Sequence, residues 1–377
     1  MADNFASQNN TTTVECIPVE SLISDLSDTV ESKIIFFFLY VFVLVFGAAG
    51  NSCVVGTILM RKNLHTVRNY FLLNLAVSDL IVTFTSGFVT PITTFRRVWI
   101  FGKAMCTIVP YFQACSTWIS TCTLAVIAID RFILIVLPAR RPISKGQAVK
   151  TVTLLWGITL VFNAHVAIRQ KYTSLLALPS GPAYCGMYCV EIWNDPSDRR
   201  MYGVTIFIFQ FIVPLLVICC CYSAMYWKLN KRPRNRSSRY RRFYRTNKLL
   251  VAMVIAFVVC WLPLILFHTL RDFNLLPQIL RKQEYFMAIV LHFVAMTSTC
   301  CNPVLYALFN DQLREAFFGF NRATGPPLNR AGVTTNNNTR LSCSANCSST
   351  LNPKYSLVPT RALSLEEEPT ILMESNL

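Results

Sequence analysis

Charged residues are scarce in this sequence. Only 14% of its 377 residues are Asp, Glu, Lys or Arg, against roughly a quarter in soluble domains, whereas 53% are hydrophobic. The mean hydropathy is accordingly positive, at +0.44. This composition excludes an ordinary soluble protein and predicts an integral membrane protein.

The chain also lacks the residue sets of enzymes and metal centres. Its four His residues form no pair at a metal-ligand interval, and no nucleophile is accompanied by a base. We expect no catalytic residues and no resident cofactor. A transporter would carry a repeated half or several facing charges in the bilayer, and the sequence has neither. A membrane transporter is therefore kept only as an alternative.

Seven apolar segments are each long enough to cross a bilayer, which takes about 20 residues. They predict an all-α membrane protein, a seven-transmembrane helix bundle. The fourth segment is short and is interrupted by Asn163 and His165. The segments are 34–60, 70–94, 105–137, 149–168, 202–229, 249–270 and 285–309.

Polar stretches flank the apolar region. Residues 310–320 place apolar side chains on one helical face, which predicts a short amphipathic eighth helix on the membrane surface. The residues beyond are rich in Asn, Ser, Thr, Pro and Gly, which is typical of a disordered segment. We therefore expect an extracellular segment at 1–33, a seven-transmembrane domain at 34–309, the surface helix at 310–320 and a cytoplasmic tail at 321–377.

Lys and Arg gather on one side of the predicted membrane. Ten of them, with no acid, lie between residues 228 and 248. Because such residues favour the cytosolic side, we place the amino terminus outside and the carboxyl terminus inside in a multi-pass plasma-membrane protein. Asn9 and Asn10 begin glycosylation acceptor sequences, although Asn235 matches the same pattern on the other side. The net charge of +16 is concentrated in this loop, which would be attracted to anionic lipid and needs no nucleic-acid partner. The loop could serve only to fix the topology, or it could also present its charge to a cytosolic partner.

Most of the fifteen Cys residues lie inside apolar segments, where they pack as small hydrophobes. Cys106 lies at the outer end of the third segment, and Cys185 and Cys189 lie in the loop after the fourth. These three face an oxidising compartment. We expect a disulfide between Cys106 and Cys189, with Cys185 as the rival partner.

Polar motifs inside apolar segments are costly in lipid and therefore indicate working parts. Asp130-Arg131-Phe132 lies at the end of the third segment, and Asn302-Pro303 with Tyr306 lies in the last. With further marks in the other segments, residues 34–320 resemble the rhodopsin-like G-protein-coupled receptors. The further marks are Asn51, Leu-Ala-Val-Ser-Asp-Leu at 75–80, Pro138, Trp156, Pro214 with Tyr222, and Phe257 with Cys260-Trp261-Leu262-Pro263.

Several stretches resemble the neuropeptide Y-type and neuropeptide F-type peptide receptors. They are 189–193, 261–264, 269–274 and 292–300, together with Pro110 and Gln113. The resemblance implies a receptor for an amidated peptide that ends in Arg and an aromatic residue. A receptor of the same fold for another ligand class is the alternative.

The resemblance further implies that Asp272 receives the guanidinium of the peptide through charge-assisted hydrogen bonds. Asp272 could instead pair with neighbouring Arg271. Gln113 could hydrogen-bond the peptide amide or contact another helix. An amine receptor would carry an acid in place of Gln113, and an opsin needs a lysine at 285–309, so amines and retinal are disfavoured. Weaker candidates for ligand contact are Glu191, Glu284, His268 and His292.

The resemblance implies that Trp261 and Phe257 form the pivot through which a ligand moves the inner end of the sixth helix outward. Pro263 permits the kink that this movement needs. Plain aromatic packing is the alternative. Asp79 could bind a sodium ion with Ser120 and Ser298, and a hydrogen bond to Asn302 would satisfy it equally.

The resemblance assigns contact with a heterotrimeric G protein, by analogy of the inhibitory type, to Asp130, Arg131, Phe132 and Pro138. Tyr222 and Tyr306 are expected to support the open form. We expect arrestin and receptor kinases to act on the tail, which has many Ser and Thr residues.

Some residues depart from the family pattern. Phe132 replaces a Tyr, and the fourth segment lacks its common outer proline. No acid lies near Phe243, so we expect no ion pair between Arg131 and the sixth helix. Thr121 stands where a larger apolar residue normally packs against Pro214 and Phe257, which predicts higher basal activity.

Overall fold

The computed structural model describes residues 16, 25–174, 185–230, 238–310 and 313–315, with backbone only at 229 and 238–246. All of them belong to the first of two units, Met1–Gly325. The second unit, Pro326–Leu377, lies outside the described residues. Asn9, Asn10 and the expected tail at 321–377 also lie outside them.

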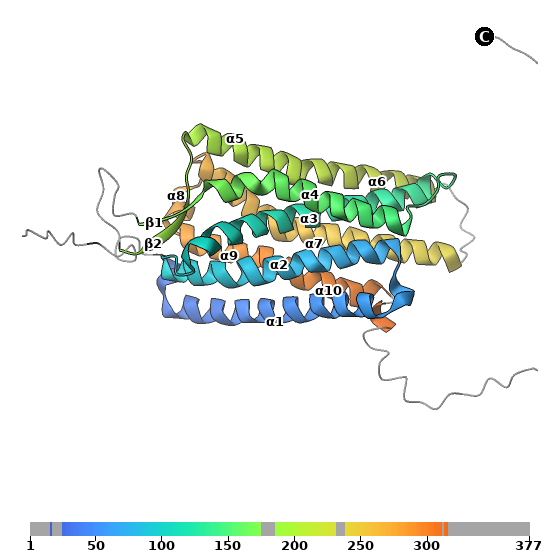
Figure 1. Cartoon of the computed structure of the whole chain (residues 1–377), viewed down its shortest axis with the longest axis horizontal. Helices are drawn as coiled ribbons and strands as arrows, with labels where there is room; N and C mark the ends of the chain where they lie inside the picture. Colours follow the sequence, from blue (N-terminus) through green and yellow to red (C-terminus); the bar gives the residue numbers. More distant parts are fainter. Residues whose placement is uncertain (1–15, 17–24, 175–184, 231–237, 311–312, 316–377) are drawn as a thin grey trace, which may run out of the picture. The chain divides into compact units, whose positions relative to one another are not determined.

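Within the described part, seven spans are helical and are long and apolar enough to cross a membrane (Figure 1). Helices satisfy their own backbone hydrogen bonds, which a bilayer requires. The seven predicted segments are thereby confirmed as helices. The first four spans are α1 (Val30–Met60), α2 (Val67–Arg96), α3 (Gly102–Val136) and α4 (Lys145–Arg169); the fifth comprises α5 (Pro196–Ile206), the π-helical η5 (Phe207–Ile212) and α6 (Val213–Asn230); the sixth is α7 (Ser238–Asp272); and the seventh comprises α9 (Glu284–Met296) and α10 (Ser298–Phe309).

Capping side chains explain why several helices are longer than the apolar segments. The Thr29 hydroxyl accepts a hydrogen bond from the Ser32 N–H and starts α1 before its apolar run. Ser144 and Gln147 form a reciprocal capping box, so α4 begins at Lys145 rather than at 149. Arg97, with a left-handed φ of 52°, ends α2.

Proline changes the geometry of the fifth and seventh spans. The wide turn of η5 lies directly before Pro214, which has no N–H to donate to the preceding turn. In the seventh span Pro303 likewise leaves the Thr299 carbonyl oxygen without its helical donor. The Asn51 side chain of α1 donates to that oxygen over 2.8 Å and joins α1 to α10.

One end of the helices carries a pair of short strands and a short helix (Figure 1), and we call it the disulfide end. There β1 (Gln170–Ser174) and β2 (Met187–Glu191) pair antiparallel, with Tyr172 opposite Cys189. The short helices η2 (Leu26–Asp28) and α8 (Gln278–Lys282) lie before α1 and before α9 in the chain. We call the opposite end the Arg131 end. There the short helix η3 (Lys62–Leu64) follows α1 in the chain.

A short helical stretch follows α10. Residues 313–315 are helical, and the Asn310 side-chain oxygen accepts the Leu313 N–H over 3.4 Å. Leu313 is fully buried. This stretch is the described part of the predicted eighth helix; residues 311–312 and 316–320 lie outside the described residues.

Candidate functional site

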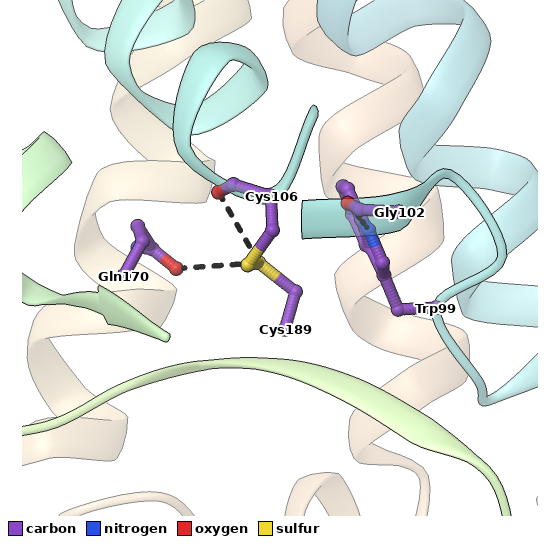
Figure 2. Close-up of a disulfide and its surroundings, with 5 residues drawn as sticks. All are labelled: Trp99, Gly102, Cys106, Gln170 and Cys189. Atoms are coloured by element: carbon purple, nitrogen blue, oxygen red, sulfur yellow. Dashed lines mark hydrogen bonds between the residues drawn. A yellow bond between two sulfur atoms is a disulfide. The ribbon is translucent and has the colours of Figure 1, made fainter. Parts of the chain in front are cut away.

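The described residues contain two disulfides, both at the disulfide end. One joins Cys106 at the start of α3 to Cys189 in β2, which confirms the favoured pairing. Figure 2 shows the Cys189 sulfur 3.2 Å from the Cys106 carbonyl oxygen and 3.5 Å from the Gln170 side-chain oxygen. The rival Cys185 instead pairs with Cys16. Sequence analysis missed this second bridge, although Cys16 lay in the expected extracellular segment.

Polar contacts attach the residues before α1 to the ends of α2 and α9. The Asp25 carboxylate accepts the backbone N–H groups of Tyr285 and Phe286, each over 3.1 Å, and so caps α9 from outside that helix. Asp28 accepts two hydrogen bonds from the Arg97 guanidinium, over 3.2 and 2.7 Å. The same guanidinium lies 4.2 Å from the centre of the Tyr285 ring.

Asp272, the expected acceptor of a ligand guanidinium, lies in a row of alternating charges at the disulfide end. Its Oδ1 is 3.1 Å from Arg199 Nη2 of α5 and 3.7 Å from Arg271 Nε. Arg271 Nη1 in turn lies 3.5 Å from Glu284 Oε1 of α9. The expected alternative, a contact with Arg271, is therefore present, but sequence reasoning missed the closer partner Arg199. The ligand role of Asp272 stays a prediction.

The remaining candidates for ligand contact differ in how far their side chains are already engaged. Gln113 is half-buried on α3, and among the described residues its side chain has no hydrogen-bond partner. No hydrogen bond from the Gln113 side chain to another helix is seen in this part of the chain, and its ligand role and the alternative helix contact both stay predictions. His292 is buried, with Nδ1 2.7 Å from the Tyr40 hydroxyl and Nε2 2.9 Å from the Ser86 hydroxyl. It would have to exchange these partners to reach a ligand.

His268 and Glu191 are half-buried, on α7 and β2 respectively. His268 lies against the Phe267 ring, with centroids 5.8 Å apart. The ligand roles of His268, His292, Glu191 and Glu284 also stay predictions.

A row of stacked rings connects the fifth and sixth spans. Phe207 and Phe211 of η5 are followed by Phe257 and Trp261 of α7, with successive centroids 6.1, 6.4 and 6.1 Å apart. Trp261 Nε1 donates to the Ser298 hydroxyl of α10 over 3.0 Å. The expected pivot residues of the sixth span therefore contact the fifth and seventh spans. Phe207 and Phe211 escaped sequence reasoning because their alignment depends on the π-helical turn.

Of the residues expected to respond near this pivot, Thr121 and Pro214 are buried and Pro263 is half-buried. Thr121 of α3 donates its hydroxyl to the Thr117 carbonyl oxygen over 2.8 Å, so the polar group is satisfied within its own helix. Pro214 is buried as the second residue of α6. Pro263 lies inside α7. Their parts in activation stay predictions.

Asp79 lies buried in the middle of α2. Its Oδ2 accepts a hydrogen bond from Asn302 Nδ2 over 2.8 Å, which is the expected alternative to an ion. The Ser120 hydroxyl oxygen lies 3.1 Å from that of Ser78, the residue that precedes Asp79 in α2. With Ser298, these residues offer oxygen atoms of the kind that hard cations prefer. A sodium ion at this place stays a prediction.

Arg131 pairs with the residue before it. Arg131 Nη2 lies 2.6 Å from Asp130 Oδ2, and the two side chains are 12% and 4% exposed. Tyr222 of α6 is half-buried and packs against the core. Tyr306 is fully buried, and its hydroxyl has no partner in the described part of the chain.

The other residues expected at this end lie near Arg131 in the chain. Phe132 packs against the core, and Pro138 is exposed in the turn that follows α3. The expectation that no acid faces Arg131 from near Phe243 concerns side chains outside the described ones. The G-protein contacts stay predictions.

The comparison with known families agrees with this arrangement. Residues 50–306 match the family model described as 7 transmembrane receptor (rhodopsin family). The chain belongs to this family, the class A G-protein-coupled receptors, whose members are multi-pass plasma-membrane receptors and not enzymes.

Among curated proteins, the chain is similar to neuropeptide Y receptor type 2 of three species. It is 32% identical to the Sus scrofa protein over 307 residues, which cover 79% of this chain and 78% of the relative. It is 32% identical to the Homo sapiens protein and 33% identical to the Gallus gallus protein, each over 302 residues that cover 78% of this chain and 77% of the relative. The resemblance found in the sequence is thereby confirmed.

Proposed function

We propose that this chain is a receptor for an amidated neuropeptide that ends in Arg and an aromatic residue, of the neuropeptide Y and F type. The observation that carries the proposal is the Asp272 carboxylate at the disulfide end, 14% exposed and bound to guanidinium groups. A partly desolvated carboxylate that already holds a guanidinium suits recognition of a peptide Arg. The similarity to relatives named neuropeptide Y receptor type 2 supports this ligand class.

In this proposal the disulfide end faces the outside of the cell, because disulfides persist in oxidising compartments. The Arg131 end then faces the cytosol. The peptide places its Arg on Asp272 and its terminal amide near Gln113. The stacked rings that end at Trp261 carry the change inward, and the inner end of the sixth span moves outward.

The outward movement exposes Arg131 to a heterotrimeric G protein of the inhibitory type, with Tyr222 and Tyr306 supporting the open form. Such a switch needs a ligand that binds one of two packings better than the other. A sodium ion at Asp79 would favour the resting packing. Arrestin and receptor kinases act on the tail in this proposal.

The experiment is nucleotide exchange on purified heterotrimeric G proteins of each subtype, with membranes that contain the full-length receptor. The probes are amidated peptides ending in Arg-Phe and Arg-Tyr, with free-acid and citrulline analogues as controls. We expect exchange on the inhibitory type with the amidated Arg peptides and a large loss with either analogue. Exchange that responds only to another ligand class would overturn the proposed ligand.

A further inference from the structure

Arg199 reaches from α5 to the carboxylate of Asp272 on α7. Its Nη2 lies 3.1 Å from Asp272 Oδ1, closer than Arg271 Nε at 3.7 Å. The second carboxylate oxygen also faces α5, because a Cβ placed on Gly203 would lie 3.7 Å from Oδ2. Both oxygens that a ligand guanidinium would use thus face α5, and Oδ1 is already paired with Arg199.

The two arginines are held unequally. Arg271 has a second acid within reach, since its Nη1 lies 3.5 Å from Glu284 Oε1. Among the described residues, Arg199 pairs with no acid other than Asp272, and its side chain is 35% exposed. Moving Arg199 into solvent therefore breaks one ion pair, whereas moving Arg271 out of this row would break two.

Electrostatic repulsion disfavours a third guanidinium at Asp272. From α9 to α5 the row runs Glu284, Arg271, Asp272 and Arg199, which alternates in sign and sums to zero. A ligand Arg added to Asp272 would lie beside two like charges, which is unfavourable at contact distance. Binding must therefore be an exchange in which one resident guanidinium departs.

We propose that Arg199 is a specificity-determining residue that occupies the guanidinium subsite on Asp272 and is displaced by the Arg of the peptide. It lowers the affinity of the receptor for every cationic ligand. Only a ligand that binds Asp272 more strongly than Arg199 does can then occupy the subsite. This inference rests on the proposed function, because it requires a ligand guanidinium at Asp272.

The test is competition binding on the full-length receptor in membranes. The probes are an amidated peptide ending in Arg-Phe and its citrulline analogue, in which an uncharged urea replaces the guanidinium. We expect Arg199→Gln to tighten binding of the Arg peptide by about tenfold, the size of one net charge-assisted hydrogen bond. Binding of the citrulline peptide should change by less than about twofold, since it does not compete for the same charge.

Two further variants separate this local exchange from a general change of charge. Arg200→Gln removes the same charge one residue away, where no ion pair with Asp272 is found, and should leave both peptides unaffected. Arg199→Lys keeps a cation and should restore much of the competition. In the double variant Arg199→Gln with Asp272→Asn, affinity should equal that of Asp272→Asn alone, because the coupling is lost.

The outcomes distinguish failure of this inference from failure of the proposed function. If Asp272→Asn abolishes the preference for Arg over citrulline but Arg199→Gln does not tighten binding, the inference is overturned and the proposed site stands. If the receptor reaches the surface and shows no such preference even with Asp272 intact, the proposed site and the inference both fail. Equal tightening by Arg199→Gln and Arg200→Gln would also overturn the inference.

Discussion

Gly50 of α1 lies against Pro303 of α10 with no space for a side chain. A Cβ placed on Gly50 would lie 2.8 Å from both the Cβ and the Cγ of Pro303. The close approach lets the Asn51 side chain reach the Thr299 carbonyl oxygen that Pro303 leaves without a donor. Small residues at helix contacts allow such approaches inside a membrane.

Gly50→Val should therefore destabilise the receptor. Overpacking against a proline ring costs typically about 1–3 kcal/mol, because neither partner is flexible. We expect a lower midpoint of thermal unfolding for the purified receptor in detergent. Gly56→Val is the matched control, since nothing lies within 4 Å of a Cβ there. Equal shifts for the two variants would contradict this packing.

Removing the bridge between Cys16 and Cys185 should lower thermal stability. The bridge closes a separation of 169 residues, and cross-links of long loops restrict the unfolded chain. Cys16→Ser, Cys185→Ser and the double variant should give the same fall in the unfolding midpoint under non-reducing conditions. If the unfolding midpoint of the double variant falls by the sum of the falls in the two single variants, the two residues are not partners.

Asp272→Asn should reduce the potency of an Arg-ended amidated peptide by about 10- to 100-fold, the range of hydrogen bonds to charged groups. The measurement is peptide-dependent nucleotide exchange at equal surface expression.

Asp195→Asn is the control at the same end of the molecule. Hydrogen bonds from Ser197 hold the pKa of the Asp195 carboxyl below its usual value, so it is charged at pH 7. Asn caps helices as well as Asp does, so this variant removes charge without loss of the α5 cap. Equal loss in both variants would argue against a specific role for Asp272.

Thr121→Ile should lower signalling in the absence of ligand. The added apolar atoms would fill the buried position that the family resemblance predicts to pack against Pro214 and Phe257. The measurement is ligand-free nucleotide exchange per receptor at the surface. Thr205→Ile is the control, because Thr205 is half-buried on α5 and makes the same type of hydrogen bond to its own helix. Unchanged basal exchange in Thr121→Ile would discard the packing argument.

Much of the fold could be predicted because a bilayer leaves few alternatives to an apolar helix of about 20 residues. The capping box of Ser144 and Gln147 was also readable, and it would have placed the start of α4 correctly. The π-helical η5 was not readable, because Pro214 allows several ways of accommodating its missing donor.

The candidate site was predicted less completely than the helices. Asp272 stood out because of the resemblance, but Arg199 lies 73 positions earlier in a different span. Its contact depends on how α5 and α7 meet, which no local pattern encodes. The Cys16 bridge was missed for the same reason, since pairings between distant cysteines follow from the folded structure.

Asp25 supplies the acceptor that the first amides of α9 lack within their own helix. The seventh span is therefore completed by the beginning of the chain, more than 250 residues away. Shortening the chain past Asp25 would fray the start of that span and disturb Glu284 beside it, even if nothing in the removed segment ever touched a ligand. Fusion tags for this receptor are best placed ahead of Cys16, because the disulfide to Cys185 and the Asp25 cap of α9 are then both kept.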